Sequence, residues 1–305
     1  MKKLTIATTQ YGLTDISSEE QFWAGIADKV REAAAQGAEM IVFPEYLTAH
    51  LLSLEPPMLH EEACAYLERK TGEYLRFFGE LSREADIAIL AGTHICRVDE
   101  AEDGKEETPL GDREYANRAY LFFPDGRIEF QNKVHLTPEE QIRWPLASGE
   151  DLNVFETPWG KMAILTCYDI EFPELSRAAA LCGVETILCP SYTDSAYGYH
   201  RVRHCAQARA VENQLFVVLS GLVGALSEDR PQVDTGFSQA GVFAPCDFPF
   251  EPDGVVRAGE TNLDMTLLAE LDFHLLRENR ARGAVAPFYD RKPELYEREL
   301  RRSGH

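Results

Sequence analysis

Cys167 stands where an apolar segment changes abruptly into a helical one. The run before it, Met162–Leu165, is typical of a buried strand, and an alanine-rich stretch with helical spacing, Leu175–Cys182, follows Pro173 and Glu174. A proline suits a first helical turn, and an acidic residue there complements the helix dipole. The pattern predicts an elbow near a helix N-terminus, where a thiol pKa is lowered and backbone N–H groups stabilise an oxyanion. A free cysteine is also a common small core residue, so this context alone leaves both roles open.

Two charged residues also stand at the ends of predicted strands. Glu45 comes after the apolar strand Met40–Phe43 and Pro44, and Lys133 ends the strand Ile128–Lys133. Ligand-facing residues gather at the carboxyl ends of strands in α/β folds. Taken singly, Glu45 also suits an ordinary loop and Lys133 an exposed surface. Taken with a thiol, the carboxylate can accept a proton, and the ammonium can stabilise an oxyanion after attack on an electrophilic carbon.

The elements that would position these residues alternate between strands and helices. Tight turns, Pro124-Asp125-Gly126 and Pro158-Trp159-Gly160, join some strands as hairpins, which favours mixed rather than purely parallel sheets. Strands are predicted at Leu4–Thr9, Met40–Phe43, Ile87–Ile95, Tyr115–Phe123, Ile128–Lys133, Leu152–Thr157, Lys161–Thr166, Glu185–Pro190, Leu215–Ser220, Ala240–Ala244, Gly254–Ala258 and Met265–Leu271. Helices are predicted from Ser17 or Ser18 to about Gln36, at Glu61–Ala85 with Gly72 as the candidate interruption, and at Leu175–Cys182, His200–Glu212 and Asp272–Arg282. The acidic stretch Arg97–Arg113 and the segment Gly221–Ser238 are interpreted as loops.

Composition excludes several classes of partner. The net charge of −21 over 305 residues argues against nucleic acid and anionic membrane surfaces. No stretch approaches the roughly 20 apolar residues of a membrane span, and the start, MKKLTIATTQ, indicates a first strand rather than a signal peptide. The seven cysteines are scattered without a C-x-x-C pair, which favours reduced thiols in a cytoplasmic protein.

Cofactor motifs are absent from the sequence. There is no G-x-G-x-x-G after the first strand, no P-loop and no H-E-x-x-H, so we expect neither a cofactor nor a metal. His200 and His204 share a helical face, but no third metal ligand is evident. Arg201, Arg203 and Arg209 are interpreted as salt-bridge residues rather than as a substrate carboxylate site.

Three segments together resemble the catalytic motifs of the nitrilase, or carbon–nitrogen hydrolase, superfamily. They are FPEY at Phe43–Tyr46, NKVHL at Asn132–Leu136 and TCYDIEFPE at Thr166–Glu174, in the family's order and at similar spacing. The resemblance runs nearly end to end and includes Asn117–Ile128, Ala208–Val218 and Arg291–Tyr296. It implies an α/β fold, a four-layer α-β-β-α sandwich with two mixed β-sheets. We expect one domain over residues 1–283 and a tail, 284–305, that docks on a partner subunit.

The resemblance also implies roles for individual residues. Glu45 would be the general base, Lys133 the oxyanion stabiliser and Cys167 the nucleophile. Many members of the family carry a second glutamate shortly after the lysine, and spacing favours Glu140 over Glu139.

The pocket residues are predicted from their neighbours. The backbone N–H of Tyr168 would complete an oxyanion hole. Ser191 and Tyr192 follow a strand directly and either line the pocket or form a structural turn. We expect specificity in the loops Ser191–Tyr199, Arg97–Arg113 and Gly221–Ser238.

The residues after the nucleophile suggest which bond is cut. Tyr168-Asp169 resembles the amidase, ω-amidase and carbamoylase branches, whereas nitrilases proper usually have Trp-Glu there. The expectation is hydrolysis of a small linear amide through a thioester, with release of ammonia. A nitrile reacting through a thioimidate is the first alternative and N-carbamoyl cleavage the second. A non-catalytic binding member and an ammonia-supplying domain of a synthetase remain further alternatives. The family also implies a homodimer, paired through the helix after the nucleophile.

Overall fold

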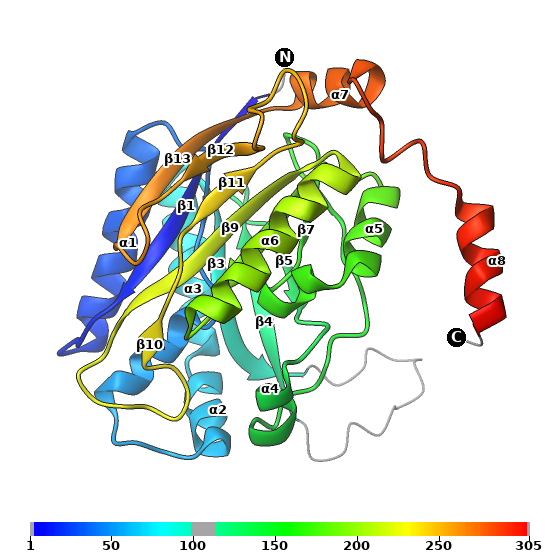
Figure 1. Ribbon diagram of the computed structural model, residues 1–305. Helices are drawn as coiled ribbons and strands as arrows, with labels where there is room; N and C mark the ends of the chain where they lie inside the picture. The colour runs from blue at the N-terminus through cyan, green and yellow to red at the C-terminus, as the bar shows by residue number, and fades with distance from the viewer. Residues whose placement is uncertain (1–2, 99–113, 304–305) are drawn as a thin grey trace.

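The computed structural model describes residues 3–98 and 114–303, in which strands and helices alternate along most of the chain (Figure 1). The strands are β1 (Lys3–Leu13), β2 (Met40–Val42), β3 (Ala88–Arg97), β4 (Tyr115–Phe122), β5 (Ile128–Asn132), β6 (Phe155–Glu156), β7 (Lys161–Ile164), β8 (Thr186–Ser191), β9 (Phe216–Ala225), β10 (Thr235–Gly236), β11 (Gly241–Phe243), β12 (Val255–Ala258) and β13 (Met265–Asp272). The helices are α1 (Glu19–Ala35), α2 (His60–Glu68), α3 (Thr71–Ala85), α4 (Pro138–Arg143), α5 (Pro173–Leu181), α6 (Ala196–Asn213), α7 (Phe273–Arg282) and α8 (Pro293–Ser303), with the 3₁₀ helices η1 (Leu47–Leu54) and η2 (Cys167–Glu171).

The strands form two six-stranded layers with matching arrangements. One layer runs β5-β4-β3-β2-β1-β13, and the other runs β6-β7-β8-β9-β11-β12. In each layer three neighbouring strands are parallel, β1 to β3 in the first and β7 to β9 in the second. Antiparallel strands flank them, β4 and β13 in the first layer and β6 and β11 in the second. The mixed pairing predicted from the hairpin turns is therefore confirmed.

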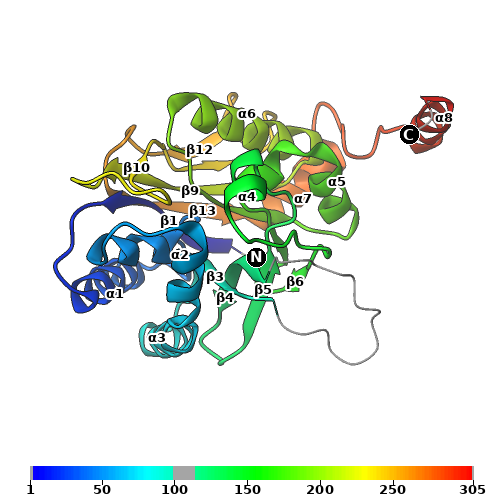
Figure 2. The same cartoon turned by 90° about the horizontal axis from the view of Figure 1, so that it is seen from below.

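The layers pack face to face and are covered by helices on their outer faces (Figure 2). Ile6 and Val42 from the first layer meet Ile164 and Val218 from the second in one buried apolar cluster. A second cluster joins the first layer to α1, α2 and α3, and a third joins the second layer to α5 and α6. This α-β-β-α order agrees with the predicted α/β fold.

The two layers are also joined by hydrogen bonds. Gln10–Leu13 of β1 pairs in parallel with Gly221–Gly224 of β9, so the strands form one continuous network rather than two separate sheets. The prediction that Gly221–Ser238 is a loop is wrong at its start, because β9 continues to Ala225 and β10 lies further along. Gly221 is needed here for packing, because a Cβ there would lie 2.0 Å from Ser238 Oγ.

Two further boundaries differ from prediction. The helical stretch predicted at Glu61–Ala85 breaks at Arg69 and Lys70, and Gly72 lies inside the first turn of α3. The Lys70 side chain forms a salt bridge with Glu19 of α1. A residue far away in the sequence therefore holds the chain where the helix breaks. The predicted excursion Arg97–Arg113 lies outside the described residues except for its first two positions.

The directions of the strands bring the segments that carry Glu45, Lys133 and Cys167 to one edge of the fold. β5 runs parallel to β3 and β2, because two antiparallel pairings separate it from β3. β7 runs parallel to β9, and β9 runs parallel to β1. The carboxyl ends of β2, β5 and β7 therefore lie at the same edge of the fold, where α/β proteins bind ligands. None of the described helices is long and apolar enough to span a membrane.

Candidate active site

Glu45 is held by a strained turn at the end of β2. Its neighbour Tyr46 adopts a left-handed backbone conformation, with φ 56°, and the Tyr46 N–H donates to Thr93 Oγ1 at 2.8 Å. The Pro44 carbonyl lies so close to β3 that only a glycine fits opposite it, because a Cβ on Gly92 would be 2.1 Å from that oxygen. The turn therefore fixes the Glu45 side chain, which is 1% exposed.

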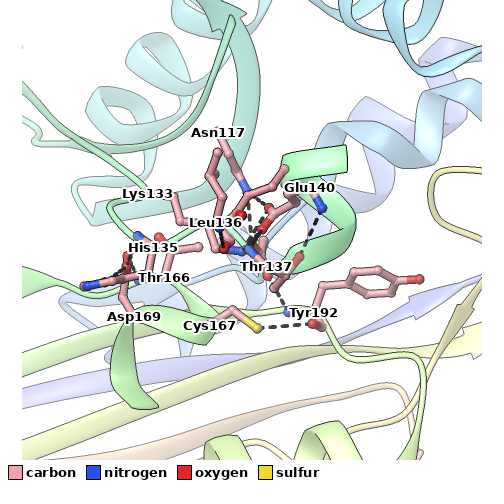
Figure 3. A network of polar contacts seen from close by, with 12 residues as sticks. Asn117, Lys133, His135, Leu136, Thr137, Glu140, Thr166, Cys167, Asp169 and Tyr192 are labelled. Atoms are coloured by element: carbon pink, nitrogen blue, oxygen red, sulfur yellow. Dashed lines mark hydrogen bonds and ion pairs between the residues drawn. The ribbon is translucent and has the colours of Figure 1, made fainter. Parts of the chain in front are cut away.

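Lys133 lies at the centre of the buried polar cluster (Figure 3). Its ammonium Nζ is 2.8 Å from Glu45 Oε1 and 2.9 and 2.8 Å from the two carboxylate oxygens of Glu140. The Lys133 backbone is tied on both sides, since its N–H donates to Asn117 O and its carbonyl accepts from Gly149 N–H. The ammonium therefore stands between two carboxylates and is only 2% exposed.

The start of α4 explains why Glu140 rather than Glu139 joins this cluster. Thr137 caps the helix, and the Oε2 of Glu140, at the third helical position, accepts from the Thr137 N–H at 2.8 Å. Glu139 points outward and lies 3.6 Å from Arg143, with both side chains largely exposed. The sequence T-P-E-E already contained this capping signal.

Two buried donors of the cluster were not predicted from the sequence. Asn117 Nδ2 donates to Glu45 Oε1 at 2.9 Å and to Glu140 Oε1 at 3.3 Å. The Tyr46 hydroxyl donates to the same Glu140 oxygen at 2.6 Å. Two carboxylates beside one ammonium leave an excess negative charge, which these donors stabilise. The available signal was an asparagine inside β4, every residue of which is buried, a position where an unpaired amide is costly.

Cys167 is the first residue of η2 and faces the cluster. Its backbone has φ 49°, and its Sγ donates to the Tyr192 carbonyl at 3.2 Å. Burial raises the pKa of the Cys167 thiol, and the Glu45 carboxylate raises it further, against smaller lowering effects of Lys133 and Ser191. The predicted lowering of the thiol pKa is therefore wrong. The elbow exists, but η2 separates Cys167 from α5, and burial outweighs any effect of the helix.

The surroundings shift the pKa values of Glu45 and Glu140 in opposite directions. Burial raises the pKa of Glu45, with Lys133 acting in the opposite direction. Burial alone would raise the pKa of Glu140 too, but its bonds to Lys133, Tyr46 and Thr137 hold it below the usual range. Burial likewise works against the charge of Lys133, yet the two carboxylates raise its pKa well above the ordinary value. Glu140 and Lys133 thus stay charged, and Glu45 takes up a proton more readily.

A cavity of about 480 Å³ opens onto this cluster. Tyr192 lines it and donates its N–H to Glu45 Oε2 at 3.0 Å, while Tyr168 lines the side formed by η2. Ser191 ends β8, is buried beside Cys167 and is not among the lining residues. The structure thus brings Glu45, Lys133, Glu140, Cys167, Tyr168 and Tyr192 to one cavity and sets Ser191 behind it.

Residues 137–139, 143 and 144 in and around α4, Glu171 of η2, and Arg201 and Val202 of α6 form part of the remaining walls, and two of the predicted specificity loops form another part. Residues 193–195 and Gly198 precede or begin α6, and Arg230 with residues 231, 232 and 234 belongs to the β9–β10 connection. His200 and His204 stack at 5.8 Å on α6 and are not among the lining residues. Within residues 3–98 and 114–303 no group of three or more His, Cys, Asp or Glu side chains suits a metal ion.

Comparison with known proteins identifies relatives over nearly the whole chain. "Probable hydrolase YhcX" of Bacillus subtilis (strain 168) is 38% identical over 95% of this chain and 54% of its own length, so the chain spans about half of that protein. "Omega-amidase NIT2-A" of Xenopus laevis is 25% identical over 99% of this chain and all of its own length.

Solved structures share the fold. Nit3 of Saccharomyces cerevisiae, a member of the nitrilase superfamily, superposes with a TM-score of 0.69 at 20% identity, covering 92% of this chain and 94% of that one. A mutant of the Nesterenkonia AN1 amidase gives a TM-score of 0.71 at 20% identity, covering 97% of each chain. The family model "Carbon-nitrogen hydrolase" matches residues 5–280. The chain therefore belongs to the carbon–nitrogen hydrolase family.

Proposed function

We propose that this chain is an amidase that hydrolyses a small linear amide through a thioester on Cys167. The observation that carries the proposal is the buried contact of Lys133 Nζ with both Glu45 and Glu140, in the same cavity as the Cys167 thiol. Membership of the carbon–nitrogen hydrolase family and relatives named as ω-amidases support it. The cavity accepts a small molecule and lies at the edge where the three segments meet.

The first half-reaction follows from the charges of the cluster. Because the pKa of the Cys167 thiol is raised, little thiolate exists beforehand, so Glu45 accepts the proton as Sγ attacks the amide carbon. The ammonium of Lys133 and the backbone N–H of Tyr168 stabilise the resulting oxyanion. Glu45 then gives its proton to the leaving nitrogen, the carbon–nitrogen bond breaks, and ammonia leaves behind a thioester.

Water completes the cycle at the same carbon. Glu45 takes a proton from water, the hydroxide adds to the thioester, and Lys133 again faces the oxyanion. Collapse releases the carboxylic acid and returns the proton from Glu45 to Cys167. Glu140 remains ionised throughout and keeps Lys133 charged and oriented, with Asn117 fixing both carboxylates.

The proposed function is tested by ammonia release from a panel of substrates. The panel contains aliphatic amides, dicarboxylic ω-amides, N-carbamoyl amino acids and nitriles, each with wild type and Cys167→Ala. We expect amide turnover that Cys167→Ala abolishes, because the thioester cannot form without Sγ. Nitrile turnover would favour the thioimidate route, and carbamoyl turnover the ureido branch. A folded wild type silent on the whole panel would instead favour a binding role or ammonia delivery to a synthetase.

The assembly and location are part of the same proposal. The chain forms a homodimer through the face of α5, and the tail 284–305 docks on the partner subunit, outside a catalytic domain of residues 1–283. Support comes from α8, whose apolar side chains Leu295 and Tyr296 are exposed. A cytoplasmic location is supported by the seven cysteines, all of them free thiols.

A further inference from the structure

Asp169 lies two residues after Cys167, yet it does not line the cavity. It is fully buried, with 0% exposure, and its carboxylate points toward the segment that follows β5 (Figure 3). Its Oδ1 accepts from the His135 N–H at 2.7 Å and faces His135 Nδ1 at 2.9 Å. Its Oδ2 accepts from the Val134 N–H at 3.3 Å and the Thr166 N–H at 3.2 Å.

These contacts connect the two segments that carry the nucleophile and the lysine. Val134 and His135 follow Lys133 directly, and Thr166 precedes Cys167. β5 begins the strand order and β7 is the second-last strand at its other end, so in the described sheet these two strands are not neighbours. The spacing between Lys133 and Cys167 therefore depends on contacts such as those of Asp169 rather than on strand pairing.

The chemistry of the contact requires a carboxylate. Each of the three backbone partners is an N–H donor, and an ionised carboxylate is acceptor-only, with two oxygens that can take all of them. An asparagine of the same shape would turn an N–H₂ group toward an N–H donor. Asp169 also closes η2, because its backbone carbonyl accepts from the Phe172 N–H. The Phe172 ring stacks on His135 with centroids 3.7 Å apart.

We propose that Asp169 is a positioning residue that sets the separation of Cys167 from Lys133. The inference rests on the proposed function. The two residues after Cys167 therefore have different roles. Tyr168 lines the cavity, whereas Asp169 binds backbone N–H groups behind it. Its influence on the reaction is therefore independent of which substrate is bound.

The test compares Asp169→Asn with Glu185→Gln. Glu185 is a matched control, since it is a buried carboxylate with two 2.8 Å bonds to Arg277 and is not a cavity residue. On the best amide of the panel we expect Asp169→Asn to lower kcat by about ten- to a hundredfold, because a displaced lysine stabilises the oxyanion poorly. KM should change by less than about threefold, since the cavity walls are intact. Glu185→Gln should lower Tm while keeping kcat.

A readout that does not need turnover separates this inference from the proposed function. The pH profile of Cys167 alkylation by iodoacetamide should shift to higher pH in Asp169→Asn, because a displaced Lys133 then lowers the pKa of the Cys167 thiol less. If the wild type is inactive on every amide and Asp169→Asn still shows this shift, the proposed function is contradicted and the positioning role is supported. Unchanged kcat and an unchanged alkylation profile in Asp169→Asn would overturn the inference.

A second variant covers the case in which Asp169→Asn does not fold. His135→Phe removes one contact of four and keeps a ring to stack on Phe172. We expect kcat to fall by about two- to tenfold with KM unchanged, because the backbone N–H bonds remain. A kcat equal to that of wild type would count against the inference.

Discussion

Two glutamates bound to the same ammonium have different environments, and this difference assigns their roles. Glu140 has four hydrogen-bond donors around it, from Lys133, Tyr46, Asn117 and the Thr137 backbone, which favour its charged form. Glu45 is buried with fewer compensating bonds and keeps contact with the thiol. A carboxyl group with a raised pKa accepts and returns protons near neutral pH. A carboxyl group with a lowered pKa stays ionised there and acts as a fixed charge.

The first prediction concerns the pH dependence of this base. Because the pKa of Glu45 is raised above its ordinary 4.5, the ionised base is lost as pH falls through that raised value. The acidic limb of kcat/KM should therefore lie above pH 4.5. In Glu45→Gln, kcat/KM for the amide should fall by about a hundredfold or more at neutral pH, because no group accepts the thiol proton and returns it to the leaving nitrogen. A limb at or below the ordinary value, or amide turnover as fast as in wild type, would contradict the assignment.

The second prediction concerns Arg201 at the cavity wall. Its Nε lies 3.3 Å from both Glu171 oxygens, and its terminal nitrogens have no partner among the described residues. Arg230 instead donates to the carbonyls of Ser53 and Glu55. Arg143, the third arginine of the cavity lining, lies 3.6 Å from Glu139. Because the predicted salt bridge of Arg201, to Glu171, uses only Nε, we propose that its terminal nitrogens bind a remote substrate carboxylate. Arg201→Gln should raise KM about tenfold for dicarboxylic ω-amides and leave neutral amides unchanged. Equal effects on both substrate classes would exclude this role.

At the scale of elements, the turn after β2 depends on the shape of β3. The pairing of β3 with β4 shifts register between Leu90 and Thr93, and Gly92 in that irregularity adopts φ 65°. Its missing side chain lets the Pro44 carbonyl approach and the Thr93 hydroxyl accept from the backbone after Glu45. One glycine in a neighbouring strand therefore positions the base.

The third prediction compares two glycine substitutions. Gly92→Ala should destabilise the fold by about 1–3 kcal/mol or more, because it combines a left-handed conformation with a backbone clash. It should also lower kcat, since relief of the clash moves Glu45. Gly79→Ala in α3 is the matched control, with open space around the new methyl group and an expected gain of about 0.5–1 kcal/mol. Denaturant unfolding and kinetics measure both. Equal stabilities of the two variants would contradict the packing argument.

At the scale of the whole molecule, α8 lies away from the sandwich (Figures 1 and 2). It follows an extended connection after α7, and its apolar side chains Leu295 and Tyr296 are exposed. A helix of this kind is stable when its apolar face packs against another surface. This supports the proposal that the tail docks on a partner subunit.

The fourth prediction tests that docking. The double variant Leu295→Glu, Tyr296→Glu should reduce the molar mass measured by light scattering, because charged groups would then enter the apolar contact. Glu297→Lys, also on α8 and already exposed, is the control and should keep the wild-type mass. Thermal unfolding of the sandwich should be nearly unchanged in both. Identical masses for the double variant and wild type would exclude a role of these two side chains in assembly.

The sequence alone determined the local features of this protein. Apolar periodicity, turn residues and helix caps depend on neighbours within a few positions, so most strands and helices were predicted near their observed bounds. The motif order predicted that Glu45, Lys133 and Cys167 would meet, because parallel strands present their carboxyl ends at one edge.

Tertiary structure alone decided the features that depend on distant segments. Burial between the second layer and its covering helices raised the pKa of Cys167, opposite to the local expectation. Asn117 from β4 joined the two carboxylates, and Asp169 reached the segment after β5, contacts that no local pattern encodes. The same is true of Gly221, whose apparent loop is a strand because a second strand lies against it. Sequence patterns report which elements form, whereas solvation and hydrogen bonding at the site depend on which elements become neighbours.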